Sequence, residues 1–431
     1  MQQQRDKQPV SRAERASVRP ARSWAADVGP GLTTLASDND PGGIATYTLA
    51  GAWYGYDLLW VCVLSYPSMV ALQLIAARVA SITGQGLTAN MRAHYAPIFF
   101  YFAVARFLIA NTFNIAVDIL AMGTAMRAFT SAPVALLALS CGALSIALQW
   151  FVPYARYARV VQWFTLGMFA YVGVIVVLHV PWQTIGWRMF VPHVIWTESY
   201  TTMLIAVFGT TISPYLLFAQ AEQEVRAREE DASTRRADVL TRELRKVRRD
   251  TLLRTALSNV GGLVVMIASA AALHRMHLAP GEPVALERVI EPFAHGFAPQ
   301  VLGIALIGTA LLALPPLAGS AAQAVASSFD WRRGERRDTR IAVLLIAITA
   351  LGTALAMLLS AFGVDPVMAL YWSAIVNGMT ITPVLILLIL LSAKREAIGD
   401  LAAHVSLRAL CWVATLATGV ALVAHYVLAI V

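Results

Sequence analysis

A short polar stretch interrupts the first hydrophobic segment of the chain, and its residue types are those that bind cations. The stretch, residues 37–43, reads Ser-Asp-Asn-Asp-Pro-Gly-Gly. Proline removes a backbone donor and glycine weakens a helix, so we expect a helix to break here. A break at bilayer depth is tolerated where the freed backbone is buried in protein or lines a water-filled cavity. A carboxylate beside such a break is a functional-site hypothesis. The residues that define this break are Asp38, Asp40, Pro41, Gly42 and Gly43.

A second hydrophobic segment carries a similar interruption at its middle. Its sequence there is Phe-Gly-Thr-Thr-Ile-Ser-Pro, ending at Pro214. A pair of simple proline kinks is the alternative explanation, but the carboxylates, the glycines and the matching second break favour a site. Discontinuous helices in corresponding positions of two inverted halves are the best sequence indicator of a transporter binding site.

The two breaks together offer oxygen ligands. Asp40 supplies a charged oxygen, and the backbone carbonyls of residues 37–42 and 208–211 supply neutral ones. The hydroxyls of Thr210 and Ser213 can bind a metal directly or cap exposed amides. An all-oxygen shell suits hard cations such as Mg²⁺ or Mn²⁺.

Two further spans carry polar side chains. Asn111, Asn114 and Asp118 follow the spacing i, i+3, i+7 and share one helix face in the third span. This stripe predicts either a proton or water path or hydrogen bonds between helices, and the two alternatives are evenly matched. In the tenth span Asn377 is a candidate neutral ligand, with helix–helix contact as the alternative.

These residues must be positioned by membrane-spanning helices. The chain is 58% hydrophobic and 13% charged with a mean hydropathy of +0.64, which identifies a polytopic membrane protein of all-α class. We expect about eleven transmembrane helices. They are placed at 29–55, 57–77, 97–125, 133–152, 158–180, 197–220, 252–273, 298–327, 340–362, 366–392 and 407–430.

The distribution of basic residues predicts the orientation. Of the 33 Lys and Arg residues, only Arg127, Arg188, Arg275 and Arg288 fall in one set of alternate loops, and Arg106 lies inside the third span. The remainder lie on the other side, which is therefore predicted to be cytoplasmic. We expect a multi-pass protein of the bacterial inner membrane with its N-terminus in the cytoplasm and its C-terminus outside. Because Arg106 is near the cytoplasmic end of its span, it is expected to snorkel.

The spans group into two halves. Residues 1–26 form a basic cytoplasmic tail, and 27–180 and 197–392 form a first and a second repeat of five helices each. Residues 404–431 form an extra eleventh helix. A charged cytoplasmic loop at 222–250 has the pattern of an amphipathic helix with lipid-headgroup contact, and its lack of interleaved aromatic residues argues against nucleic acid.

Several motifs resemble the Nramp family of divalent-metal transporters, and more closely its divergent Nramp-related branch. Residues 29–32 (Gly-Pro-Gly-Leu) followed by 40–43 (Asp-Pro-Gly-Gly) look like the entry to the family's first helix and its Asp-Pro-Gly-Asn motif. Asp118 within Val-Asp-Ile-Leu-Ala-Met-Gly looks like the family's acidic third-helix segment. The resemblance implies a LeuT-like fold of two inverted five-helix repeats with broken helices 1 and 6. It also implies metal bound between these helices, and proton co-transport for which Asp118 and Asp38 are the candidate pathway.

The departures from the family pattern bear on the metal. Gly43 stands where the family has a ligating Asn, and Ser213 and Tyr215 stand where it has Met and His in helix 6. Asn377 is the nearest polar substitute for the Gln of helix 10. The lost Met and Asn raise Mg²⁺ as the substrate beside the family's Mn²⁺ and Fe²⁺.

Taken together, the sequence predicts a secondary active transporter that moves a divalent metal cation, with protons as a candidate co-substrate. The alternative is a symporter of the same fold for an amino acid or another small solute, and a receptor or scaffold that uses the 222–250 loop ranks below both. No phosphate-binding loop, zinc-protease motif or nucleophile elbow is present, so neither an enzyme nor a cofactor is expected. The expected partners are the metal ion and the lipid bilayer, without nucleic acid.

Overall fold

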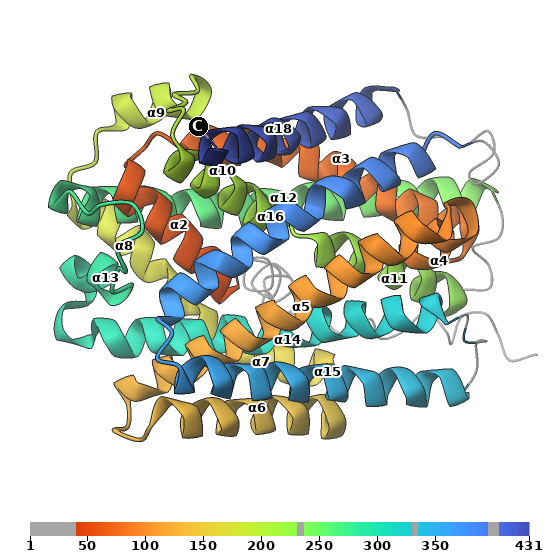
Figure 1. Ribbon diagram of the computed structural model, residues 1–431, viewed down its shortest axis with the longest axis horizontal. Helices are drawn as coiled ribbons and strands as arrows, with labels where there is room; N and C mark the ends of the chain where they lie inside the picture. Colours follow the sequence, from red (N-terminus) through yellow and green to blue (C-terminus); the bar gives the residue numbers. More distant parts are fainter. Residues whose placement is uncertain (1–39, 231–236, 330, 332–334, 395–404, 431) are drawn as a thin grey trace, which may run out of the picture.

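The chain folds into a bundle of long helices. The computed structural model describes residues 40–230, 237–329, 331, 335–394 and 405–430, and this part contains no strand (Figure 1). Ten of its helices or helix groups are long and apolar enough to cross a membrane, and α2 is the described part of one more span. The main helices are α2 (Pro41–Tyr54), α3 (Leu59–Thr83), α5 (Pro97–Ala125), α6 (Val134–Phe151), α7 (Tyr154–Val161), α8 (Phe169–Val177), α10 (Glu198–Thr211), α11 (Pro214–Glu230), α12 (Ala237–Leu273), α14 (Ala298–Ser328), α15 (Glu335–Ala361), α16 (Pro366–Leu391) and α18 (Val405–Ile430).

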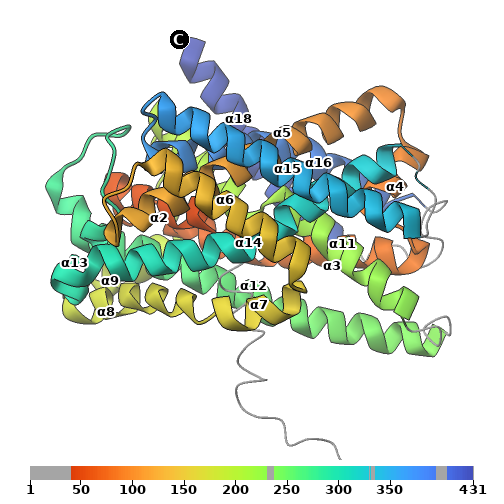
Figure 2. The same cartoon turned by 90° about the horizontal axis from the view of Figure 1, so that it is seen from below.

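The helices run between two ends of the bundle, named here after the short helices found there. The α13 end holds α9 (Trp182–Phe190) and α13 (Glu287–Ala294), and the α4 end holds α4 (Leu87–His94) (Figure 1). Helices α6 and α15 lie side by side along the lower edge in Figure 1, and they cross the front of the bundle in the turned view (Figure 2). Helix α18 packs against α3, α10 and α16 on the other side.

The expected spans agree with the observed helices to within a few residues for α5, α6, α14, α16 and α18. The largest difference is α12, which begins at Ala237 although its span was placed from 252. Hydropathy detects only the apolar part of a helix, and the charged turns before it are helical as well. Much of the 222–250 loop is thus helix, apart from residues 231–236, which lie outside the described part. The tail 1–26 and residues 27–39, which include Asp38, also lie outside it.

The fifth span is in pieces, which the sequence did not indicate. Between α7 and α8 the chain forms the 3₁₀ helix η3 (Phe164–Met168). Thr165 is fully buried and donates its hydroxyl to the Gln162 carbonyl at 2.6 Å. Gly167 lies against the backbone of α14, where an added Cβ would meet the Val301 carbonyl at 2.8 Å. The hydrogen bond of Thr165 and the close packing of Gly167 therefore stabilise the 3₁₀ segment. Its uniform hydropathy predicts one continuous helix.

Two helices with internal prolines have the freed carbonyl group capped by a side chain from another helix. Pro383 in α16 has no amide hydrogen for the Met379 carbonyl, and Arg106 of α5 donates Nη2 to that oxygen at 3.0 Å. Pro316 in α14 leaves the Leu312 carbonyl free, and Tyr154 donates its hydroxyl to it at 3.2 Å. The expectation that Arg106 snorkels was wrong, because a freed carbonyl inside the bundle offers the guanidinium a closer partner.

Candidate functional site

Helix α2 begins at the first predicted break. Asp40 is the N-cap residue, and its Oδ1 accepts a hydrogen bond from the Gly43 amide at 2.7 Å. Pro41 follows at the first helical position, where its missing amide hydrogen costs no intrahelical bond. The cap fixes the direction of the carboxylate. Its second oxygen, Oδ2, accepts no hydrogen bond from the residues that the structure describes, so it is available to a ligand.

The two glycines keep the space beside this carboxylate open. A Cβ added to Gly43 would lie 3.3 Å from Asp40 Oδ1 and 3.7 Å from the Thr210 methyl group. A Cβ added to Gly42 would lie 3.4 Å from the same carboxylate oxygen and 3.5 Å from Ser373 Oγ. The start of α2 therefore faces the end of α10 on one side and α16 on the other.

The second break separates α10 from α11 at Ile212 and Ser213, as the sequence predicts. In an uninterrupted helix the Thr210 carbonyl would accept from residue 214, but Pro214 has no amide hydrogen. The Ser213 hydroxyl donates to this carbonyl at 2.9 Å and contacts the Gly209 carbonyl at 3.3 Å. Ser213 thus stabilises the broken backbone by supplying the hydrogen that Pro214 lacks.

One residue that sequence reasoning missed connects the two breaks. The Tyr47 hydroxyl lies 3.1 Å from Thr211 Oγ1. Tyr47 is one turn after Gly43 in α2, so it lies on the same helix face. The sequence signal for this contact is a tyrosine one turn beyond the predicted break. The contact fixes the start of α2 beside the end of α10.

The polar stripe of α5 faces the bundle interior. Asn114 and Asn377 form a reciprocal pair, in which Nδ2 of each donates to Oδ1 of the other at 2.9 and 3.3 Å. Asn111 donates to the Leu317 carbonyl and to Ser320 of α14. These bonds place Asn377 in a contact between α5 and α16, and they engage both polar atoms of its amide.

Asp118 is different, because it has an unused oxygen. Its side chain is 1% exposed, and Oδ2 has no hydrogen-bond partner among the described residues. Helix α5, which carries Asp118, packs against α2, the helix that Asp40 caps. A buried carboxylate with a free oxygen is stabilised by a proton or by a cation. Asp38, the other residue predicted for a proton pathway, lies outside the described part.

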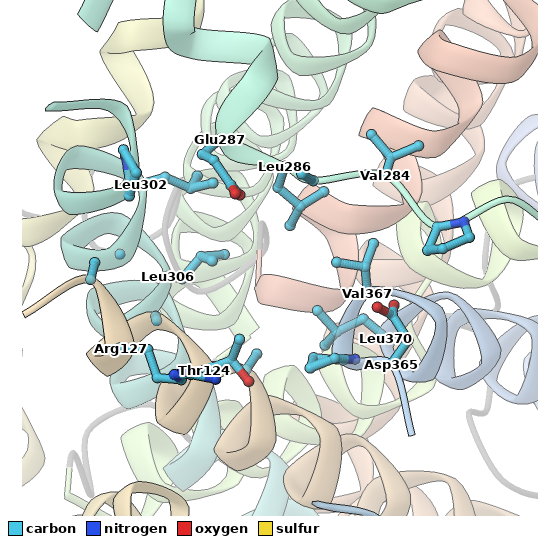
Figure 3. A pocket seen from close by; sticks show the side chains of 18 residues that line it. Thr124, Arg127, Val284, Leu286, Glu287, Leu302, Leu306, Asp365, Val367 and Leu370 are labelled. Carbon is cyan, nitrogen blue, oxygen red and sulfur yellow. The ribbon is translucent and has the colours of Figure 1, made fainter. Parts of the chain in front are cut away.

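A cavity of about 590 Å³ opens at the α13 end (Figure 3). Its lining includes Leu370 of α16, one turn before Ser373, and Ala121 of α5, one turn beyond Asp118. It includes none of the predicted ligands. Next to Leu370, Tyr371 packs edge-on against Trp53 of α2 with ring centroids 5.5 Å apart. The cavity therefore comes within one helical turn of Ser373 on α16 and of Asp118 on α5. Its charged lining residues are Arg127, Glu287 and Asp365.

The side chains at the two breaks offer oxygen atoms as metal ligands. A carboxylate oxygen of Asp40 and the hydroxyl oxygen of Ser373 lie on either side of the space at Gly42, and the described residues contain no cluster of three or more His, Cys, Asp or Glu side chains. One carboxylate with neutral oxygens suits an ion that keeps part of its water shell.

Known proteins share both the sequence pattern and the fold. The family model described as "Nramp: Natural resistance-associated macrophage protein-like" matches residues 31–428. The chain is 25% identical over 420 residues to the divalent metal cation transporter MntH of Burkholderia ambifaria, covering 94% of this chain and 90% of that one. It is also 25% identical over 442 residues to MntH of Granulibacter bethesdensis, covering 97% and 92%.

Solved structures agree on the architecture. The manganese transporter of Eremococcus coleocola, in complex with an aromatic bis-isothiourea substituted compound, superposes with a TM-score of 0.68 at 15% identity, covering 94% of this chain and 87% of that one. Mhp1, a nucleobase-cation-symport-1 family transporter, superposes with a TM-score of 0.59 at 12% identity, covering 93% and 90%. The fold is thus the LeuT-like one, and the described residues show the break of its sixth helix between α10 and α11. Given the family match over nearly its whole length, the chain is a member of the Nramp family of membrane transporters.

Proposed function

We propose that the protein is a secondary transporter that moves a divalent metal cation, and that the ion binds where the two broken helices meet. The observation that carries this proposal is the position of Asp40, whose capped carboxylate faces the end of α10 across the space left by Gly43. Half-helix ends and unwound carbonyl groups at such a junction coordinate cations in transporters of this architecture. The relatives named as divalent metal cation transporters support the substrate class.

The ligand types favour a hard ion. Asp40, Thr210 and Ser213 supply oxygen only, and Gly43 supplies no side chain. Met203 is fully buried in α10 well before the break, so its sulfur belongs to the packing of that helix. Hard oxygen ligands suit Mg²⁺ and Mn²⁺ better than soft metals. We therefore rank Mg²⁺ and Mn²⁺ ahead of Fe²⁺.

The arrangement of the ends supports an orientation. Arg127, Arg188 and Arg288 lie at the α13 end (Figure 1). Among the described basic residues, Arg92 of α4 and Lys394, which donates to the His94 carbonyl at 2.8 Å, lie at the α4 end. With the positive-inside rule, the α4 end faces the cytoplasm of a bacterial inner membrane. The cavity at the α13 end then forms the approach from outside.

Asp118 is the proposed proton carrier. Its oxygen without a partner lies on α5, which packs against the helix that Asp40 caps, so a cation arriving at Asp40 favours release of a proton from Asp118. Metal binding and proton release are then coupled by charge alone.

The test compares two matched aspartates in proteoliposomes. Asp40 and Asp365 each cap a helix that begins with proline, with cap distances of 2.7 and 2.8 Å, and asparagine also caps well. Asp40→Asn is expected to abolish uptake of Mg²⁺ and Mn²⁺, because the charged ligand is lost while the cap remains. Asp365→Asn is expected to keep uptake at saturating metal. A pH-sensitive dye in the same vesicles reports proton movement, which Asp118→Asn is expected to remove.

Unchanged uptake of every divalent ion in Asp40→Asn would show that the ion does not bind at the break. Tighter calorimetric binding of a neutral amino acid than of either metal would favour the small-solute symporter instead.

A further inference from the structure

Ser373 of α16 is the polar side chain of that helix that lies beside the Asp40 carboxylate. A Cβ added to Gly42 would lie between the two side chains, 3.5 Å from Ser373 Oγ and 3.4 Å from Asp40 Oδ1. These distances limit the separation of the two oxygens to about 7 Å. Ser373 is 2% exposed, so it is enclosed in the bundle at this point.

The hydrogen bond of Ser373 leaves its acceptor side free. Its hydroxyl donates to the Leu370 carbonyl of its own helix at 2.7 Å. A hydroxyl has one donor hydrogen and two acceptor lone pairs. No other hydrogen bond to Ser373 Oγ is found in the described part of the chain. The group therefore presents lone pairs without a hydrogen, which is what a cation requires.

The other amide or hydroxyl candidates are less available. Both polar atoms of the Asn377 side chain are engaged by Asn114. The Thr210 atom that an added Cβ at Gly43 would meet is its methyl carbon, at 3.7 Å, rather than its hydroxyl oxygen. This leaves Ser373 as the side-chain oxygen that α16 contributes to the space beside Asp40.

We propose that Ser373 is a ligand of the transported cation, and that its hydroxyl helps to select a hard, partly hydrated divalent ion. An Mg²⁺ ion bonded directly to two oxygens at about 2.1 Å holds those oxygens roughly 4 Å apart. If Asp40 Oδ1 and Ser373 Oγ are further apart than this, the ion binds one of them directly and the other through a water molecule. Mg²⁺ dehydrates reluctantly and binds through few protein ligands with several waters retained. This inference rests on the proposed function and adds a residue that determines its specificity.

The experiment replaces the oxygen by sulfur and compares two sites on one helix. Thr380 lies two turns further along α16, is 1% exposed, and donates its hydroxyl to the Val376 carbonyl at 2.7 Å, so its surroundings match those of Ser373. Ser373→Cys and Thr380→Cys are reconstituted in proteoliposomes, and initial uptake of Mg²⁺, Mn²⁺ and Cd²⁺ is measured. Ser373→Cys is expected to raise the Cd²⁺ to Mg²⁺ rate ratio by about tenfold or more, because sulfur favours soft metals. Thr380→Cys is expected to leave the ratio as in the parent protein.

A second pair removes the oxygen without adding sulfur. Ser373→Ala is expected to raise the Mg²⁺ KM several-fold, and Thr380→Ala is expected to leave it unchanged. Equal selectivity in the two cysteine variants, or equal KM values in the two alanine variants, overturns the role of Ser373. If Asp40→Asn still abolishes uptake in that case, the proposed function stands and only this inference fails.

Discussion

Arg106 stabilises the bundle by replacing an amide that Pro383 cannot supply, and this statement leads to a quantitative prediction. The guanidinium Nη2 lies 3.0 Å from the Met379 carbonyl oxygen, and the same guanidinium lies over the Phe102 ring at 5.5 Å. Arg106→Met removes the donor while keeping an apolar side chain of comparable length. Pro383→Ala restores the amide hydrogen four residues after Met379.

The magnitude follows from the orphaned carbonyl. A buried polar group left without its partner costs about 1–3 kcal/mol, and hydrogen bonds measured inside membrane proteins average about 0.6 kcal/mol with a maximum near 1.7. We therefore expect Arg106→Met to lower the free energy of unfolding by about 1–2 kcal/mol in the parent. In the Pro383→Ala background the carbonyl has its own amide, and the same substitution is expected to cost about 1 kcal/mol less.

The assay is a double-mutant cycle of unfolding in detergent micelles. The cation–π contact with Phe102 and the burial of the guanidinium are lost in both backgrounds, so they cancel in the coupling energy. A coupling energy indistinguishable from zero would refute the reasoning. The Tyr154 contact in α14 offers an independent repeat, with Tyr154→Phe and Pro316→Ala acting on the Leu312 carbonyl.

Two further substitutions test the packing around the site. A Cβ at Gly209 would overlap the Ala374 carbonyl of α16, so Gly209→Ala is expected to destabilise the protein by about 1–3 kcal/mol. The control is Gly419→Ala in α18, where an added Cβ would meet no atom within 4 Å. This control is expected to be close to neutral in the same thermal unfolding measurement. Tyr47→Phe removes the hydroxyl that contacts Thr211 and is expected to cost about 0.5–1.5 kcal/mol; an unchanged melting temperature would show that this contact does not join the two breaks.

The sequence by itself determined the class of the protein, the spans and the break in the sixth span. Each of these depends on properties that act locally along the chain. Apolar length decides where a helix can cross a bilayer, and proline removes an amide wherever it stands. The cap at Asp40 is local too, because its partner, the Gly43 amide, is three residues away.

Only the tertiary structure decided which polar groups meet. Asn114 and Asn377 are 263 residues apart in the chain, and Tyr47 and Thr211 are 164 apart. Ser373 and Asn377 both fall within the tenth expected span, residues 366–392, and only Asn377 was named there as a candidate ligand. It could not foresee that Asn114 engages the Asn377 amide while Ser373 lies beside Asp40. The rotation and depth of each helix, which packing against its neighbours sets, determine the direction of a side chain, and no local pattern encodes that rotation.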